Sequence, residues 1–370
     1  MSQLVKFGDV VENLNLTASD TQLNRYERVV GLEHIIPNEL KIQNWDLMAN
    51  LHEGTSFRRI FKKGHVLFGK RRAYQRKVAL ADFDGICSSD ILVFSAKKAL
   101  LAGLLPYVVQ SERFFDHANQ TSSGSLSPRT RWQDLAKFTF QLPLLDEQAR
   151  IVELMTAVDE HLDALRSQLE VAKGSRAAVL YQLLSAGGDD WVNTTLGDIA
   201  EVLSGFAFKS ENFNENEGVP LIRIRDLQIL TQTEVNYLGN YDNRYLVKDG
   251  DFLIGMDGEF RCYEWLGGTA LLNQRVCRIQ DFALVRVVPR FIFFIVNKYL
   301  MEIEGSTSFT TVKHISTKQV NEIEFPLPPI AEQKRIVEIV SSMDDVIQAN
   351  EQAIAEAKVL RTTLLNKEIS

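Results

Sequence analysis

Residues 140–153 read FQLPLLDEQARIVE, and residues 325–338 read FPLPPIAEQKRIVE. Nine of the fourteen positions are identical at a constant offset of 185 residues. A repeat of this period is too long for a solenoid, whose units span about 20–50 residues. The chain is therefore predicted to consist of two homologous halves.

A coiled-coil pattern follows each copy of this motif. Apolar residues recur at alternating steps of four and three, which is the spacing of a heptad seam. The seam comprises Ile151, Met155, Val158, Leu162, Leu165 and Leu169 in the first half, and Ile336, Val340, Met343, Ile347, Asn350 and Ile354 in the second. Such a stripe needs a partner, so either each helix packs on its own domain or the two helices pack on each other. Asn350 interrupts the apolar pattern, and a single buried Asn often fixes register or partner choice.

Short β-like runs separated by glycines characterise the segments outside these helices. They lie at 65–68, 78–81 and 91–95, and again at 219–224, 252–254 and 275–279; helical stretches are expected at 100–115 and 290–303. The predicted fold is α+β, with two globular domains separated by two long helices. The expected order is a first domain at 1–142, a helix at 143–185, a second domain at 186–327 and a helix at 328–370, with a linker at 187–190.

Composition excludes several classes of protein. With 370 residues, 45% of them hydrophobic and 24% charged, the chain can form a folded core and is not disordered. The longest apolar run, 291–296, is far shorter than the roughly 20 residues of a membrane-spanning helix. The first nine residues have neither the charged nor the apolar region of a signal peptide. Three cysteines without CxxC spacing favour reduced thiols, and we expect a cytoplasmic protein.

The net charge of −7 conceals a difference between the two halves. Residues 1–142 carry +5, whereas residues 186–327 carry −7. Residues 58–77 contain nine Lys or Arg and no acidic residue. Such a run is either a solvated face or a surface for a polyanionic partner. We favour the partner, because a run of one sign repels itself.

No catalytic or metal site is predicted. The sequence GHVLFGK at 64–70 fits the phosphate-loop pattern, but Arg71 follows where the loop needs Ser or Thr. The six histidines do not fall at ligand spacing. The Asp257-Gly258-Glu259 segment is interpreted as a turn without a histidine or metal partner. We therefore expect no catalytic residue, no metal and no cofactor in this chain.

The chemistry that stands out is that of DNA binding. The segment KRRAYQRK at 70–77 combines cations for phosphates with an aromatic ring for stacking and Arg and Gln for base edges. Hydroxyl-rich loops at 122–130 and 306–313 either donate to phosphates or are merely turns. The candidate DNA-binding residues are Lys70, Arg71, Arg72, Tyr74, Gln75, Arg76, Lys77, Ser125, Arg129 and Arg131 in the first half, and Arg223, Arg225, Arg261, Arg275, Lys313 and His314 in the second. To bind DNA, the acidic second domain would need these cations to cluster on one side of its surface.

These residues carry a resemblance to a known family. It rests on GHVLFGKRRAYQRKVALADFDGICSSDILVF at 64–94, SGSLSPRTRWQDLAKFTFQLPLLDE at 123–147, GDFLIGMDGEFRCYEWLGGTALLNQRVCRI at 250–279 and LPPIAEQKRIVE at 327–338. The chain resembles the specificity (S) subunit of Type I restriction-modification systems. The resemblance implies two target recognition domains, each reading one half of a bipartite DNA site, and helices that form an antiparallel coiled coil.

The same resemblance implies the partners. The helices would set the spacing of the half-sites and hold two modification subunits. Those partners, and not this chain, would bind S-adenosylmethionine and methylate adenine, and a restriction subunit would add ATP- and Mg²⁺-dependent translocation and cleavage. Two alternatives remain open: a single-chain nuclease or methyltransferase with an unrecognised site, and a tether whose helices recruit proteins without reading DNA.

Overall fold

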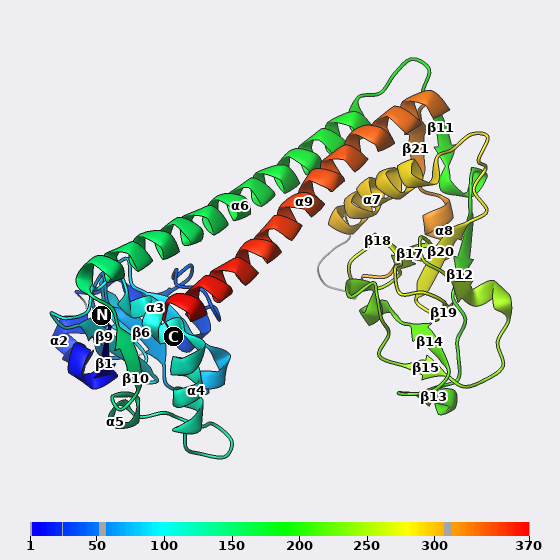
Figure 1. Ribbon diagram of the computed structural model, residues 1–370. Helices are drawn as coiled ribbons and strands as arrows, with labels where there is room; N and C mark the ends of the chain where they lie inside the picture. Colours follow the sequence, from blue (N-terminus) through cyan, green and yellow to red (C-terminus); the bar gives the residue numbers. More distant parts are fainter. Residues whose placement is uncertain (1, 24, 52–56, 307–312, 370) are drawn as a thin grey trace. The chain divides into compact units, whose positions relative to one another are not determined.

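The computed structural model describes residues 2–23, 25–51, 57–306 and 313–369. They form two compact units, one made of the residues up to Ser167 together with those from Glu351 onward, the other of Gln168–Asn350. The boundary between the units runs through both long helices. The predicted α+β architecture, with two repeated domains separated by long helices, is confirmed (Figure 1).

The two long helices are α6 (Leu145–Ser185) and α9 (Ile330–Glu368). At 1.5 Å per residue, each is about 60 Å long. They are antiparallel in both units, because interhelical ion pairs join low numbers in one helix to high numbers in the other. These pairs are Arg150–Glu368 and Asp159–Arg361 in the first unit, and Arg176–Asp344 in the second.

All twelve predicted seam positions are buried or half-buried. The seam residues also contact the globular domains, so the two packing alternatives are not exclusive. Ile151 and Met155 share a core with β-strands and with Leu365 of α9, while Ile336 and Val340 share one with Leu184 of α6. The buried residues are Ile151, Met155, Leu162, Ile336, Val340 and Ile354, and the half-buried ones are Val158, Leu165, Leu169, Met343, Ile347 and Asn350.

The first domain consists of two four-stranded sheets and a short ribbon. One sheet has the order β2-β9-β6-β7 and the other β4-β3-β8-β5, with β3 and β8 parallel. The strands of the first sheet are β2 (Val11–Leu14), β9 (Ile91–Ala96), β6 (Val66–Gly69) and β7 (Val78–Leu80). Those of the second are β4 (Asp46–Leu47), β3 (Arg28–Val30), β8 (Gly85–Cys87) and β5 (Arg59–Phe61). The ribbon pairs β1 (Gln3–Lys6) with β10 (Thr139–Leu142), and the longer helices are α3 (Leu105–Gln110) and α4 (Glu112–Gln120).

The second domain repeats this arrangement. Its sheets have the orders β12-β20-β17-β18 and β13-β15-β14-β19-β16, with β14 and β19 parallel. The first sheet is built from β12 (Glu201–Ser204), β20 (Val276–Gln280), β17 (Phe252–Gly255) and β18 (Cys262–Glu264). The second contains β13 (Phe213–Asn214), β15 (Asn236–Tyr237), β14 (Val219–Ile222), β19 (Ala270–Leu272) and β16 (Leu246–Val247). The ribbon is β11 (Val192–Thr195) with β21 (Glu324–Leu327), and the helices are α7 (Pro289–Ser306) and α8 (Thr317–Asn321).

A buried glutamine explains much of the repeated motif. Gln148 accepts a hydrogen bond from the Leu101 N–H at 2.8 Å and donates to the Ala99 and Pro143 carbonyls. Gln333 makes the same three bonds in the second half. It accepts from the N–H of Val288 and donates to the carbonyls of Arg286 and Pro328. Each side chain thereby ties the start of a long helix to a loop of its own domain.

Two predicted elements differ from the structure. The helix expected at 100–115 is divided into α3 and α4, because Ser111 adopts an extended conformation and caps α4 with its hydroxyl. The strand expected at 219–224 ends at Ile222 and is followed by a 3₁₀ turn (η6, Ile224–Gln228). The cysteines Cys87, Cys262 and Cys277 are buried free thiols, and burial raises the pKa of Cys87 to about 12. None of the helices within the described residues is both long and apolar enough to cross a membrane.

Candidate nucleic-acid interface

Two arginines of the predicted set meet around one carboxylate at the end of β6. Arg129 Nε donates to Asp90 Oδ1 at 3.1 Å, and Arg71 Nη1 lies 3.6 Å from Asp90 Oδ2. Partial burial raises the pKa of Asp90, but the hydrogen bond from Arg129 and the nearby positive charges outweigh this, so the pKa lies below its usual value. Burial lowers the pKa of neighbouring Lys70. One ionised carboxylate therefore orders a surface with a cationic excess.

The backbone fixes this cluster in place. Lys70 N–H donates to the Asp90 carbonyl at 2.9 Å, and the Thr130 N–H donates to the Lys70 carbonyl at 3.0 Å. These bonds join the chain after β6 to the hydroxyl-rich loop at 122–130. Arg71 Nε also donates to the Ser127 hydroxyl at 2.8 Å. The loop at 122–130 is thus part of the cationic surface and not a separate turn. Residues 307–312 of the second predicted loop lie outside the described residues.

Arg72 adopts a conformation that is unusual for a residue with a side chain. Its φ is +54°, in the left-handed region that favours glycine, and its N–H donates to the Pro128 carbonyl at 2.7 Å. The equivalent residue in the second domain is Gly258, with a φ of +83° and an N–H donating to the Lys313 carbonyl. A non-glycine residue in this region is strained and is held there by its surroundings.

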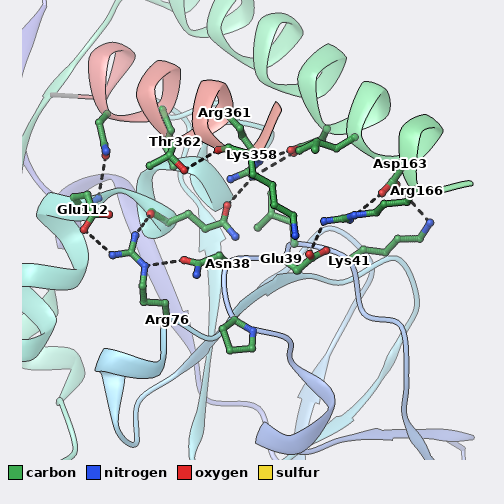
Figure 2. Close-up of a pocket in the computed structure, with 17 residues that line it drawn as sticks. Asn38, Glu39, Lys41, Arg76, Glu112, Asp163, Arg166, Lys358, Arg361 and Thr362 are labelled. Carbon is green, nitrogen blue, oxygen red and sulfur yellow. Dashed lines mark hydrogen bonds and ion pairs between the residues drawn. The ribbon is translucent and has the colours of Figure 1, made fainter. Parts of the chain in front are cut away.

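Other members of the predicted segment do not join this cluster. Arg76 donates to Asn38 Oδ1 at 2.7 Å and to Glu112 Oε2 at 2.6 Å (Figure 2). Its guanidinium also lies over the Phe115 ring. Lys77 Nζ donates to the Leu32 carbonyl. Both cationic groups therefore hold the fold together. Tyr74, Ser125 and Arg131 are exposed, and Gln75 is half-buried.

Carboxylates neutralise more of the basic run at 58–77 than its sequence indicates. Carboxylates from distant parts of the chain pair with three of its nine cations, in the ion pairs Arg58–Asp20, Arg71–Asp90 and Arg76–Glu112. Electrostatic repulsion within the run is thus weaker than expected, and it gives less support to a polyanionic partner. Lys70 and Arg72, which belong to none of these three pairs, lie next to Arg71 in the sequence.

The second domain places a different set of charges at the same position. Asp257 and His314 form an isolated β-bridge there, as Arg71 and Arg129 do in the first domain. His314 Nδ1 lies 2.6 Å from Asp257 Oδ1, and Arg275 Nη1 lies 3.6 Å from the same oxygen. The expectation that Asp257 has no histidine partner is therefore wrong. His314 is 57 residues away in sequence, and only the folded sheet brings the two side chains together.

The other predicted cations of this domain form separate ion-paired groups. Arg223 and Arg225 both contact Glu234, at 2.8 and 3.3 Å. Arg261 and Lys313 both contact Glu304. Within the described residues, each predicted cation of the second domain is matched by a nearby carboxylate, so these cations do not form one uncompensated basic face.

A further group combines ligand types that could hold a metal. Glu33, His34 and Asp46 lie close together in the first domain. However, His34 Nδ1 accepts a hydrogen bond from the Gly31 N–H at 2.9 Å. A neutral His34 then carries its proton on Nε2, the nitrogen that faces Asp46 at 3.7 Å. Neither ring nitrogen offers a free lone pair, so this geometry does not favour a metal.

Two acidic residues were absent from the predicted site: Asp90, which was not considered, and Asp257, which was interpreted as part of a turn. Each is the carboxylate on which its cluster is organised. A signal was present for Asp90, which lies directly before a predicted strand, 185 residues before Arg275. A position-by-position comparison of the two halves would have aligned Asp90 with Arg275.

The fold and the site together define a class: a duplicated α+β protein whose two domains carry polar clusters at matching sheet ends and are joined by antiparallel helices. The model of the Type I restriction modification DNA specificity domain matches residues 37–172 and 188–359. The chain therefore belongs to this family, whose members are specificity subunits and in general not catalytic.

Individual relatives agree with this assignment. The chain is 40% identical over 156 residues to the Type I restriction enzyme EcoBI specificity subunit of Escherichia coli, a match covering 42% of this chain and 32% of that relative. It is 21% identical over 403 residues to the MjaVIII specificity subunit of Methanocaldococcus jannaschii, covering 98% of this chain and 91% of the relative. A solved chain from work on assembly and conformational transition of the type I R-M system superposes with a TM-score of 0.67 at 21% identity, covering 99% and 97% of the two chains.

Proposed function

We propose that this chain is the DNA-recognition component of a Type I restriction-modification complex, and that each globular domain binds one half of a bipartite target. The observation that carries the proposal is the repeated position at the end of β6 and of β17. Both domains present a polar cluster there on the same backbone frame, Arg71–Asp90–Arg129 in one and Asp257–Arg275–His314 in the other.

The chemistry of the first cluster suits DNA. Arg pairs bidentately with guanine in the major groove, and Lys and Arg bind phosphates. Lys70, Arg71, Arg72 and Arg129 supply these groups, with Tyr74 exposed nearby for stacking. The second cluster offers a carboxylate, which accepts from the cytosine amino group, and a histidine beside an arginine. Because the two clusters differ in charge, we expect two half-sites of different sequence.

In this proposal the long helices fix the spacing between the half-sites and bind the modification subunits. The chain itself performs no reaction, and S-adenosylmethionine, ATP and Mg²⁺ belong to its partners. The domain boundaries that we propose are those of the sequence repeat, 1–142 and 186–327, with the helical segments 143–185 and 328–370 as shared scaffold.

Domain exchange tests this function. Residues 191–327 are replaced by the corresponding block of another family member, and the methylated sites are mapped by sequencing in a host that carries the modification subunit. We expect one half of the target to change and the other half and the gap to stay the same. A change in both halves, or in neither, contradicts two independent readers.

Purified chain, incubated alone with DNA, Mg²⁺ and S-adenosylmethionine, tests the enzyme alternative. We expect no cleavage and no methyl transfer, and turnover by the isolated chain would refute the proposal. A selection for bound DNA sequences tests the tether alternative. A preferred sequence is expected, whereas binding without any preference would favour a protein that recruits partners only.

A further inference from the structure

A pocket of about 500 Å³ lies inside the first unit, where the loop at 37–41 faces α6 and α9 (Figure 2). Its volume is within the range of about 300–1,000 Å³ that is common for small-molecule sites. Leu40, Leu162 and Leu365 supply an apolar part of the wall, and most of the remaining wall is polar or charged. The pocket is separate from the cluster around Asp90.

Five cationic and four anionic side chains line the pocket, which leaves a net charge of +1. The four carboxylates are each held by an arginine, in the pairs Arg76–Glu112, Arg166–Glu39, Arg166–Asp163 and Arg361–Asp159. Lys41 also contacts Asp163 at 3.7 Å. Among the described residues, Lys358 is the lining cation that has no carboxylate partner.

Three amide side chains in the lining are oriented as donors. Each has its oxygen occupied by a donor of the protein: Asn38 by Arg76 Nε at 2.7 Å, Gln110 by Arg361 Nη2 at 2.8 Å, and Asn366 by the Glu112 N–H at 3.3 Å. Because each oxygen must face its donor, the three NH₂ groups are left for other partners.

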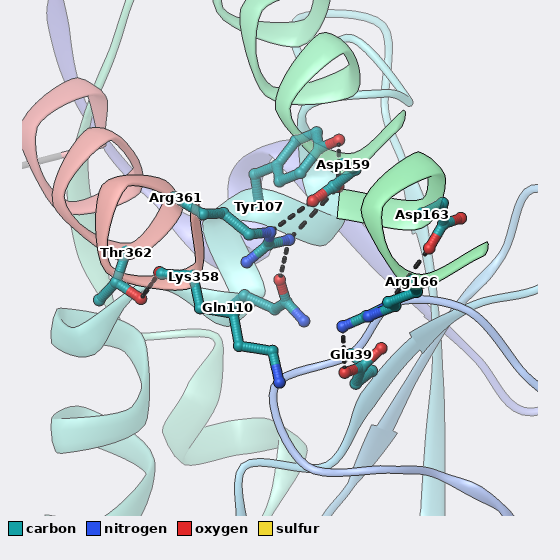
Figure 3. A network of polar contacts seen from close by, with 9 residues as sticks. All are labelled: Glu39, Tyr107, Gln110, Asp159, Asp163, Arg166, Lys358, Arg361 and Thr362. Atoms are coloured by element: carbon teal, nitrogen blue, oxygen red, sulfur yellow. Dashed lines mark hydrogen bonds and ion pairs between the residues drawn. The ribbon is translucent and has the colours of Figure 1, made fainter. Parts of the chain in front are cut away.

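Among the three amides, Gln110 gives the strongest evidence for a missing acceptor. Its side chain is almost fully buried, with 3% of the residue exposed, and its Nε2 has no hydrogen-bond partner within the described structure. Figure 3 shows this nitrogen and the Lys358 ammonium pointing into the same space beside Glu39 and Arg166. A buried donor without an acceptor is unfavourable, so an acceptor bound between these two groups would satisfy both.

We propose that this pocket binds a small organic anion. Its carboxylate or phosphate oxygens accept hydrogen bonds from Gln110 Nε2 and the Lys358 ammonium, and its apolar part packs against Leu162 and Leu365. Arg76 lines the same pocket and belongs to the segment at 70–77. Binding therefore ties that segment and the loop at 37–41 to the two long helices. The site stands on its own contacts and does not depend on the proposed role in DNA binding.

The test uses the full chain and simple probes: hexanoate, hexyl phosphate, hexylamine and hexanol. Binding is measured by calorimetry and by the thermal midpoint, which a ligand of the folded state raises. We expect hexanoate or hexyl phosphate to bind and the amine and alcohol not to bind, and the stronger anion identifies the head group. Lys358→Met and Gln110→Glu should weaken binding about tenfold or more, because each removes a donor to a charged acceptor.

Controls make the result decisive. Lys334→Met changes an exposed lysine of α9 outside the pocket and should leave binding unchanged. Lys358 is exposed on α9, so Lys358→Met is expected to fold, and circular dichroism checks both pocket variants. Binding of hexanol as tight as that of the anions, or no binding of either anion, overturns the proposal. A third outcome also overturns the proposal: neither anion binds, and the Lys358→Met variant binds a modification subunit more weakly than the unchanged chain does. The pocket would then be a binding site for an acidic side chain of the modification subunit.

Discussion

Asp90 and Arg275 occupy the same backbone position in the two domains and carry opposite charges. The Asp90 carbonyl accepts from the Lys70 N–H, and the Arg275 carbonyl accepts from the Met256 N–H, both at 2.9 Å. Asp90 contacts two arginines, whereas Arg275 contacts Asp257 and His314. The two domains keep the same backbone frame, but acidic and basic residues are exchanged at two of its positions, Arg71 against Asp257 and Asp90 against Arg275. This difference supports the proposal that the two domains read different half-sites.

Removing a cation from the first cluster tests its contact with DNA. We expect Arg71→Ala and Arg129→Ala each to weaken binding and to lower the slope of log K against log salt by about 1 if the side chain binds a phosphate. A base-reading side chain would instead relax one position of the first half-site. Fluorescence anisotropy at several salt concentrations separates these outcomes.

Two other variants serve as comparisons for this measurement. Arg113→Ala changes an exposed arginine of α4 and should leave affinity and salt slope unchanged. Arg76→Ala should mainly lower the free energy of unfolding, by about 1–2 kcal/mol, because its guanidinium is held by Asn38 and Glu112. Unchanged DNA binding by both Arg71→Ala and Arg129→Ala would make their cluster a solvated face.

Arg72→Gly tests whether the positive φ at this position is maintained for function. Glycine removes a left-handed strain of about 1–2 kcal/mol but adds about 0.5–1 kcal/mol of chain entropy loss on folding. Stability is therefore expected to stay the same or to rise slightly in urea denaturation, while DNA affinity falls. In contrast, Gly258→Ala should lower stability by about 1 kcal/mol, because φ is +83° there. A drop in stability for Arg72→Gly would show that the side chain supports the fold.

The buried glutamines offer a test of the repeated motif itself. Gln148→Leu and Gln333→Leu each leave one backbone N–H and two carbonyls without their partner. We expect each to cost about 3 kcal/mol or more, measured by urea denaturation. Gln168→Leu, at an exposed position of α6, is the matched control and should change stability little. Equal effects of all three substitutions would contradict the role that we assign to these hydrogen bonds.

What the sequence predicted well is periodic or repeated. The seam positions follow from steps of three and four, and Gln148 and Gln333 lie in the motif that identified the two halves. The partners of single charges were not predictable in this way. Arg76 meets Glu112 across 36 residues, and Asp257 meets His314 across 57. Such pairs depend on which distant strands and helices the folded domain brings together, and no local sequence pattern records that.

Asn350→Leu tests the polar interruption of the seam. Asn350 is half-buried, and its Nδ2 donates to the Val346 carbonyl of its own helix at 2.9 Å. Leucine loses only this local bond and gains apolar burial, so we expect a higher thermal midpoint. Val346→Ala changes an exposed residue one helical turn away and serves as the control. It shows how much the thermal midpoint shifts when only the helix propensity changes. A lower midpoint for Asn350→Leu would mean that the amide makes a further bond, to a partner subunit for example.

The last prediction treats α6 and α9 as a ruler between the two readers. Seven residues are inserted into each helix, around Leu165 and around Asn350, which preserves the heptad register. The insertion lengthens each helix by about 10 Å, at 1.5 Å per residue. Because DNA rises about 3.4 Å per base pair, the unread gap of the target should grow by up to about three base pairs.

The half-sites themselves should stay the same in this variant, because no residue of the Asp90 or Arg275 clusters moves within its domain. Rotation of a domain about the DNA would make the increase smaller, but it would still leave both half-sites intact. Sequencing of methylated sites in a host with the modification subunit measures the gap and the half-sites together. An unchanged gap with retained methylation would show that the helices do not set the spacing. Altered half-sites would place the reading residues on the helices instead of on the two domains.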